Sequence, residues 1–210
     1  MLQHQCMIYD GAPSVHLSQL AVGAAEKLAA HHRVLFLNSP PMVAGFRTSL
    51  AATGVAVADQ VKRGALVLTS SQEHLDNGRF DSDRMLETLK QGLEDALRDG
   101  YAGLWATGDM MWELGSTQNF ERLLEYECGL EALLQENPQL CGVCQYRRDG
   151  LPANALQEAL FTHPTVFVNS TLSRINPFYL QPATLRLRHL DGPDDHLAVM
   201  LEKLDLPVKN

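Results

Sequence analysis

No run of apolar residues in this 210-residue chain approaches the roughly 18 residues that a helix needs to cross a bilayer. The first residues, MLQHQCMIYD, do not combine a basic start with an apolar stretch, as a secretory signal would. We therefore expect a cytoplasmic protein without membrane contacts. The hydrophobic content of 45% is enough for a real core in one sizeable domain, or in one domain with an appendage.

Positive charge is scarce as well. The chain has 17 Lys and Arg against 25 Asp and Glu, which gives a formal net charge of −8. Two short basic patches, Arg147–Arg148 and Arg186–Arg188, are small beside the basic face that DNA-binding modules present. We therefore expect no direct binding of nucleic acid.

Two motifs of well-known enzyme classes are missing. The turn after the apolar run 33–37 reads LNSPPMVAGFRTS, with one glycine and no lysine, whereas a phosphate loop needs GxxxxGK[ST]. No GxSxG elbow marks a nucleophile for which His4, His74 or His163 could be the base. We expect no ATP hydrolysis by the usual route, no enzyme activity and no cofactor. Anion binding at the helix that follows the turn stays open.

Apolar runs and helical repeats alternate along the rest of the chain, which is typical of a mostly parallel α/β sheet with helices on both faces. The sequence predicts a central sheet of about six or more strands. Strands are expected at 4–9, 33–37, 65–68, 102–107, 140–146 and 165–169, and helices at 18–30, 42–52, 82–97, 120–135 and 153–161. From about Ala183 the pattern changes to a strand-like LRLRHL and an amphipathic segment, 194–204. We predict a main domain, 1–182, and a C-terminal extension, 183–210.

Ligands of such sheets bind beyond the carboxyl ends of the strands. Polar or aromatic residues follow several of the predicted strands, namely Asn38, Ser39, Ser70, Ser71, Asp109, Trp112 and Tyr146. An aromatic and apolar set could line a cavity for a small organic molecule, or could be ordinary core: Phe80, Met110, Met111, Trp112, Tyr126, Tyr146 and Phe178.

Glu127 is the most unusual residue of the helix predicted at 120–135. It shares the apolar stripe of Phe120, Leu123, Leu130 and Leu134, at spacings of three and four. Burial disfavours an ionised carboxylate unless a donor or a cation answers it. Two interpretations stay open: Glu127 is a structural tie to a hydrogen-bond donor, or it lines a ligand cavity and orients the bound molecule.

The thiols allow a metal hypothesis that we weigh lower. His4 and Cys6 face the same side of a strand, and with Cys144 they could supply soft metal ligands. Cys141 and Cys144 are three apart in a strand, so they should point to opposite faces rather than form a CxxC site. We expect reduced, buried thiols and no resident metal.

Several short motifs, in order, make the chain similar to a known family. HQCMIY, NGRFDSDRML, GYAGLWATGDMMW, LLEYE, CQY, the His163-Pro164 pair and NPFY together resemble the MEDS domain, the methanogen/methylotroph DcmR-type sensory domain, over residues 4–182. The resemblance implies a signalling input domain that senses small hydrocarbon derivatives. It also implies a RecA/KaiC-like three-layer sandwich without the phosphate loop.

The motifs carry a set of expected ligand-binding residues: His4, Cys6, Tyr9, Asp109, Trp112, Tyr126, Glu127, Cys144, Tyr146 and His163. Family members often carry Arg-x-Thr-Gly-Glu and Cys-Gln-Tyr-Asp. Here Trp105 replaces the Arg, Asp109 replaces the Glu and Arg147 follows Tyr146. These departures bear on the fine specificity of the ligand.

The leading hypothesis is a stand-alone input domain that binds a small organic ligand and relays its occupancy to a partner protein in transcriptional or signal-transduction control. Many relatives are fused to an output module and this sequence shows none, so the output would pass through a partner or self-association. The segment 194–204 is a candidate surface for either. Two alternatives are a RecA/KaiC-like assembly subunit that binds nucleotide without hydrolysis, and a metal or redox sensor that uses His4, Cys6 and Cys144.

Overall fold

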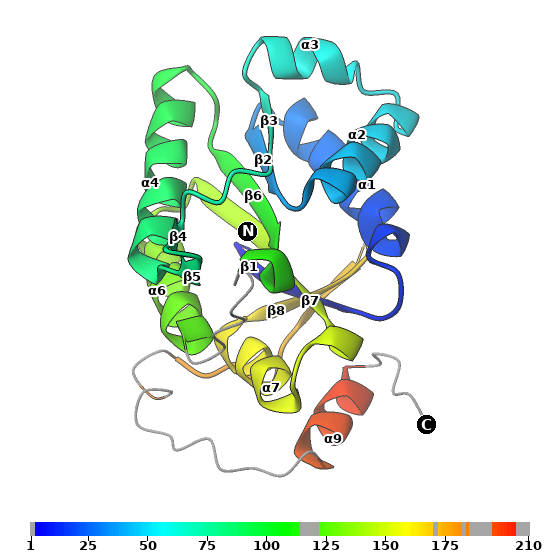
Figure 1. The fold of residues 1–210 in the computed structure, drawn as a ribbon, viewed down its shortest axis with the longest axis vertical. Coiled ribbons are helices and arrows are strands. Elements are labelled where there is room, and N and C mark those ends of the chain that lie inside the picture. The colour runs from blue at the N-terminus through cyan, green and yellow to red at the C-terminus, as the bar shows by residue number, and fades with distance from the viewer. Residues whose placement is uncertain (1–2, 114–121, 170–171, 182–183, 185–194, 205–210) are drawn as a thin grey trace.

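A seven-stranded sheet forms the centre of the molecule (Figure 1). The computed structural model describes residues 3–113, 122–169, 172–181, 184 and 195–204. The strand order is β3-β2-β6-β7-β1-β8-β9, and every neighbouring pair is parallel except β8 with β9. The strands are β1 (His4–Tyr9), β2 (Arg33–Leu37), β3 (Leu66–Thr69), β6 (Leu104–Asp109), β7 (Leu140–Arg147), β8 (Thr165–Asn169) and β9 (Leu172–Ile175).

Helices cover both faces of the sheet, as the continuous apolar strands predicted. One face carries α1 (Leu17–Ala29), α2 (Pro40–Ala52) and α3 (Val57–Lys62), and the other carries α4 (Ser82–Arg98), α6 (Leu123–Glu136), α7 (Ala153–Thr162) and α9 (Asp195–Lys203). Alternate residues of β2 show the division: Val34 and Phe36 pack with the first group of helices, and Leu35 and Leu37 with the second. The α/β sandwich of three layers is therefore confirmed.

The ends of α4 follow sequence rules closely. The Asp81 side chain accepts a hydrogen bond from the backbone N–H of Arg84, at 3.1 Å, and so caps the first turn. Gly100, just after the helix, has a φ of 86°, which a glycine adopts without strain. Between these ends one apolar face, including Met85, Leu89 and Leu93, is buried against the sheet.

Some local structure differs from the expectation. The stretch 55–62, where no helix is expected, contains α3, and its Val57 is buried in the same hydrophobic cluster as α1 and α2. Residues 73–80, outside the predicted elements, contain a short antiparallel pair, β4 (Leu75–Asp76) and β5 (Arg79–Phe80), on either side of Asn77-Gly78. The hairpin partner β9 was not predicted, and LRLRHL lies outside the described residues.

The amphipathic segment near the C-terminus is helical, as predicted, but its apolar face is covered. Leu197, Met200, Leu201 and Leu204 are all buried in the same hydrophobic cluster as α4, α6 and α7. The Arg174 side chain of β9 also donates to the carbonyl oxygen of Leu204 at 3.2 Å. The apolar face of this segment is therefore covered by the chain itself, and the role of the segment as a contact surface stays a prediction.

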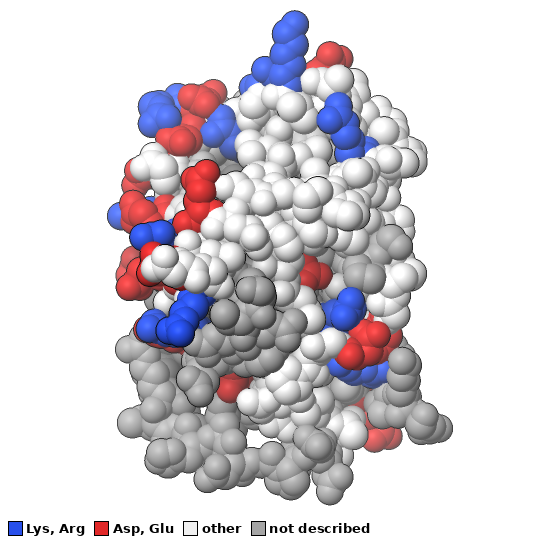
Figure 2. All heavy atoms as spheres, in the orientation of Figure 1, with Lys and Arg blue, Asp and Glu red and all other residues white. Residues whose placement is uncertain are grey.

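Charges of both signs are mixed on the face shown in Figure 2. Along α4, Arg84 lies 3.6 Å from Asp81, and Arg98 lies 2.6 Å from Asp95. The described part of this face presents no continuous basic patch. Among the described helices, none has the length and apolar character needed to cross a membrane.

Candidate functional site

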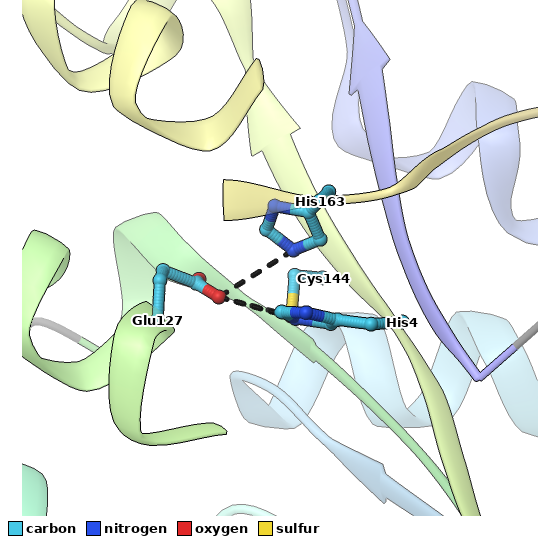
Figure 3. Close-up of side chains that lie close together, drawn as sticks. All are labelled: His4, Glu127, Cys144 and His163. Carbon is cyan, nitrogen blue, oxygen red and sulfur yellow. Dashed lines mark hydrogen bonds and ion pairs between the residues drawn. The ribbon is translucent and has the colours of Figure 1, made fainter. Parts of the chain in front are cut away.

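Four buried side chains meet between the sheet and α6 (Figure 3). They are His4, Glu127, Cys144 and His163, and one donor atom of each lies within 4.8 Å of the donor atoms of the others. Their exposed fractions run from 0% to 6%. All four belong to the set that the sequence predicted, and they come from four different parts of the chain.

The order of the strands brings these residues together. His4 is the first residue of β1, and Cys144 lies in the neighbouring strand β7, where it pairs with Cys6. His163 ends α7 just before β8, which pairs with β1 on the other side. Glu127 projects toward the two histidines from the buried face of α6. Neighbours in space are thus up to 159 residues apart in sequence, from position 4 to position 163.

His4 lies between two carboxylates. Its Nε2 is 3.3 Å from Oε2 of Glu127, and its Nδ1 is 2.8 Å from Oε2 of Glu131. Burial by itself lowers the pKa of His4, but the hydrogen bonds and charges of Glu127 and Glu131 outweigh it, so the pKa is raised. Glu131 is held in turn by the hydroxyl of Tyr179 at 2.8 Å and the amide of Gln135 at 2.9 Å.

Glu127 has partners for both carboxylate oxygens. The hydroxyl of Tyr146 donates to Oε1, and the two histidines approach Oε2, His163 at 3.4 Å. Burial raises the pKa of Glu127, but His163, His4 and Tyr146 act in the opposite direction and lower it. Glu127 is therefore a buried, ionised group that its neighbours stabilise. This agrees with the first of the two interpretations above, in which Glu127 is tied to hydrogen-bond donors.

His163 is satisfied on one ring nitrogen alone. Its Nδ1 lies 2.7 Å from the carbonyl oxygen of Ala159, which assigns a proton to that nitrogen. Its Nε2 points into the cluster and has no hydrogen-bond partner among the described residues. Burial, assisted by the charge of His4, lowers the pKa of His163 to about 4.

The thiols divide between the two faces of the sheet. The Sγ of Cys144 lies 3.8 Å from Nε2 of His4 and 4.0 Å from Oε2 of Glu127. Cys141 packs in the core of the opposite face, which confirms that the two are not a CxxC pair. Cys6 is also buried, but its Sγ is not among the donor atoms that lie within 4.8 Å of one another. Burial raises the pKa of its thiol. The four cysteines, all described, form no disulfide.

A cavity of about 30 Å³ adjoins this cluster, with His4 and Cys144 in its wall. The other residues that line it are mostly apolar and come from β2, β6, β7, α4 and α6, together with Met110. They include Met85, Leu89, Met110, Tyr126 and Leu130. The ring of Phe80 packs edge-on against Tyr126, with centroids 5.2 Å apart.

The remaining predicted residues, Tyr9, Asp109 and Trp112, lie elsewhere. Tyr9 ends β1, so it lies five residues, or about 16 Å at ~3.3 Å per residue, from His4. Its hydroxyl donates to Oδ2 of Asp109 at 2.7 Å, and Oδ1 of Asp109 accepts from the backbone N–H of Trp112 at 3.1 Å. This capping starts the short helix α5 (Met110–Glu113).

A second cleft of about 220 Å³ opens at these carboxyl ends, where the fold class predicts a ligand site. Its lining includes Tyr9, Asn38, Ser39, Trp112 and Arg147. The Nδ2 of Asn38 is buried and has no hydrogen-bond partner among the described residues. The ten predicted residues therefore form two groups: Tyr9, Asp109 and Trp112 lie at this cleft, and the other seven are buried around the four-residue cluster and its cavity.

Sequence reasoning missed several polar residues that hold these groups. Glu131 was not predicted, although it follows Glu127 by four residues and so shares its helix face. On the other face of the sheet, His16 Nε2 lies 2.9 Å from Oε1 of Gln145, whose amide donates to Thr107 at 2.9 Å. These side chains meet through tertiary packing, and no short motif marks them.

Comparison with known proteins adds one family. A model of the family described as MEthanogen/methylotroph, DcmR Sensory domain (MEDS) matches residues 3–164. This range contains His4, Glu127, Cys144 and His163, as well as Tyr9, Asp109 and Trp112. No curated protein matches the chain significantly.

Proposed function

The chain belongs to the MEDS family of sensory domains, and from that premise we propose that it binds a small organic molecule and relays its occupancy to a partner protein in transcriptional or signal-transduction control. The observation that carries the proposal is the apolar cavity beside His4 and Cys144. A few directional groups in an otherwise apolar wall are what a site for a small organic ligand needs.

The size of the cavity limits the ligand. One water-sized group needs roughly 10–15 Å³ by this measure, so the cavity of about 30 Å³ has room for about two such groups. A molecule of one or two non-hydrogen atoms fits this space, and one of three is at its limit. The family resemblance implies hydrocarbon derivatives, so the proposed ligand is a short halogenated or oxygenated hydrocarbon, with His4 and Cys144 as its polar contacts.

The position of the cavity favours a mechanical relay. Side chains of both α4 and α6 line it, and these helices also contact each other over the same face of the sheet. A ligand between them and the sheet would change their packing, and α4 carries the charged outer surface that a partner would meet. We propose binding without catalysis, since the sequence carries no nucleophile elbow.

A thermal-shift and calorimetry series with methanol, dichloromethane and longer homologues tests the proposal. We expect the midpoint of unfolding to rise with compounds of one to three heavy atoms, and less with longer ones. Ala106→Leu fills the cavity from β6 and should abolish the shift, while Ala51→Leu on the exposed surface of α2 should keep it. No response to any compound, or an equal response in Ala106→Leu, would refute the proposal.

The second cleft favours another candidate, a RecA/KaiC-like scaffold that binds nucleotide without hydrolysis. The buried, unpartnered amide nitrogen of Asn38 and the nearby Arg147 are suited to an anionic or polar ligand at the carboxyl ends of the strands. Neither the turn after β1, DGAPSVH, nor the turn after β2 carries a phosphate-loop lysine. Retention of a fluorescent ATP analogue, lost in Asn38→Ala, would support it, and no retention would exclude it.

A further inference from the structure

We infer that His4, Glu127, Cys144 and His163 form a binding site for a divalent transition metal ion of the Zn²⁺ class. Two imidazoles, a thiol and a carboxylate are a complete set of zinc ligands, and all four are buried. The metal site expected from the sequence used His4, Cys6 and Cys144. The geometry replaces Cys6 with Glu127 and His163.

The distances within the cluster fit a tetrahedral site. Bond lengths of about 2.0–2.1 Å to nitrogen or oxygen and about 2.3 Å to sulfur place neighbouring donors of a tetrahedron roughly 3.3–3.6 Å apart. Oε2 of Glu127 lies 3.3 Å from Nε2 of His4 and 3.4 Å from Nε2 of His163. Sγ of Cys144 lies 3.8 Å and 4.0 Å from the His4 and Glu127 atoms. The remaining pairs of donor atoms lie within 4.8 Å of each other, so small movements of these side chains would bring all four donors to tetrahedral positions.

The groups around the donors match what metal-binding histidines use. Such histidines donate their second ring N–H to a carboxylate or a backbone carbonyl, which fixes the ring and makes it a better ligand. His4 meets Glu131 through Nδ1 at 2.8 Å, and His163 meets the carbonyl of Ala159 through Nδ1 at 2.7 Å. The second oxygen of Glu127 accepts from Tyr146. Both imidazoles therefore present Nε2 to the same point.

The unpartnered nitrogen of His163 is the observation that favours a cation over a closed hydrogen-bond network. With its proton on Nδ1, His163 presents a lone pair at Nε2, and this atom lies 3.4 Å from an oxygen of the Glu127 carboxylate. A buried lone pair without a partner costs free energy, because burial keeps water from supplying one. A metal ion would bind this lone pair and the carboxylate oxygen together.

The donor set also selects the kind of metal. A thiolate and two imidazoles suit borderline ions such as Zn²⁺, Fe²⁺ and Co²⁺, whereas Mg²⁺ and Ca²⁺ require oxygen ligands. Coordination needs the thiolate and a free lone pair on each Nε2, so the proton of the Cys144 thiol and any proton on Nε2 of His4 are released to solvent as the metal bonds form. His4 and Cys144 also line the cavity, so the metal would form part of its wall. That role rests on the proposed function, while metal binding itself does not.

Cobalt spectroscopy of the untagged, reduced protein tests the site. We expect about one equivalent of transition metal by elemental analysis of the purified chain. After removal of the metal, Co²⁺ should give a thiolate-to-cobalt charge-transfer band in the near ultraviolet. Cys144→Ser should remove the band. Cys141→Ser is the matched control, since its thiol lies in the same strand on the opposite face, and it should keep the band.

A second variant keeps the test decisive if Cys144→Ser does not fold. Glu131→Gln removes the carboxylate behind His4 and should weaken Co²⁺ binding by about 10–100-fold. Folded wild-type protein with neither copurified metal nor the band would overturn the inference, as would a band that survives in Cys144→Ser or unchanged affinity in Glu131→Gln. A loaded site without any response to small organics would instead count against the proposed function alone.

Discussion

Glutamates of this protein show how local surroundings decide the state of one residue type. Glu127 is fully buried, yet its pKa is lowered, because two histidines and the hydroxyl of Tyr146 answer its charge. Glu158, on α7, is only partly buried, but its Oε2 has no hydrogen-bond partner among the described residues. Desolvation raises the pKa of Glu158 to about 7. The sign of the pKa shift is therefore set by the hydrogen-bond and charge partners of the carboxylate, and not by how deeply it is buried.

Glu158→Gln should stabilise the protein at neutral and alkaline pH. Because the folded-state pKa, about 7, lies above the ordinary value of 4.5, ionisation opposes folding. The cost is absent below about pH 4.5, grows up to about pH 7 and is complete above it. With partial exposure taken into account, we expect a gain of about 1–2 kcal/mol at pH 8 and almost none at pH 4.5, measured by urea unfolding.

The control for this effect is Glu202→Gln, on the exposed face of α9, which should leave the difference in stability between the two pH values unchanged. An equal gain from Glu158→Gln at both pH values would show that the amide acts by a new hydrogen bond, and would contradict the electrostatic explanation.

A single residue could be predicted where neighbours close in sequence decide its surroundings, and not where its partners are distant in sequence. Glu127 could be identified as a buried polar residue because its helix neighbours, three and four positions away, are apolar. Its partners could not be derived from such spacing. His4 and His163 reach it only because β1 lies between β7 and β8, and the sequence does not state that order. Family resemblance, which reflects the assembled fold, supplied His163.

At the scale of elements, most strands and helices could be predicted because their signals are local. The buried runs of β1 and β2 and the caps of α4 are examples. β9 could not be predicted, because LSRI is short and half exposed and becomes a strand only by pairing with β8. The segregation of Cys141 and Cys144 followed directly from the two-residue period of a strand.

Two glycine substitutions should have opposite effects on stability. An added Cβ at Gly23, within α1, meets nothing within 4 Å, so Gly23→Ala should stabilise the protein by about 0.5–1 kcal/mol through helix propensity. At Gly142, within β7, the Cβ would lie 2.3 Å from the carbonyl oxygen of Ala106 in the neighbouring strand. That backbone is fixed by the ladder, so Gly142→Ala should cost about 1–3 kcal/mol.

Chemical unfolding of both variants measures these changes, and each serves as the other's control because the substitution is chemically identical. A loss of stability in Gly23→Ala would mean that α1 is packed more closely than described, and a neutral Gly142→Ala would mean that β6 and β7 can separate locally.

At the scale of the whole molecule, the question is whether the C-terminal helix is part of the main cooperative unit. The sequence predicted an extension from residue 183, and that boundary stays a prediction. The described packing places Leu197, Met200, Leu201 and Leu204 in the cluster that also contains α4, α6, α7 and the sheet. A shared core of this kind favours one unfolding transition for the sheet and α9 together.

Leu201→Ala tests that cooperativity against Val199→Ala on the same helix. Leu201 is 3% exposed, so its truncation should cost about 2–5 kcal/mol, while Val199 is 47% exposed and its truncation should change stability by less than about 0.5 kcal/mol. If α9 belongs to the cooperative unit, Leu201→Ala shifts the whole transition, observed alike by far-ultraviolet circular dichroism and by the fluorescence of Trp105, buried on the opposite face of the sheet. If the helix unfolds first, the dichroism signal changes early while the Trp105 signal keeps the wild-type midpoint. That result would make α9 a separable element and expose its apolar face to a partner.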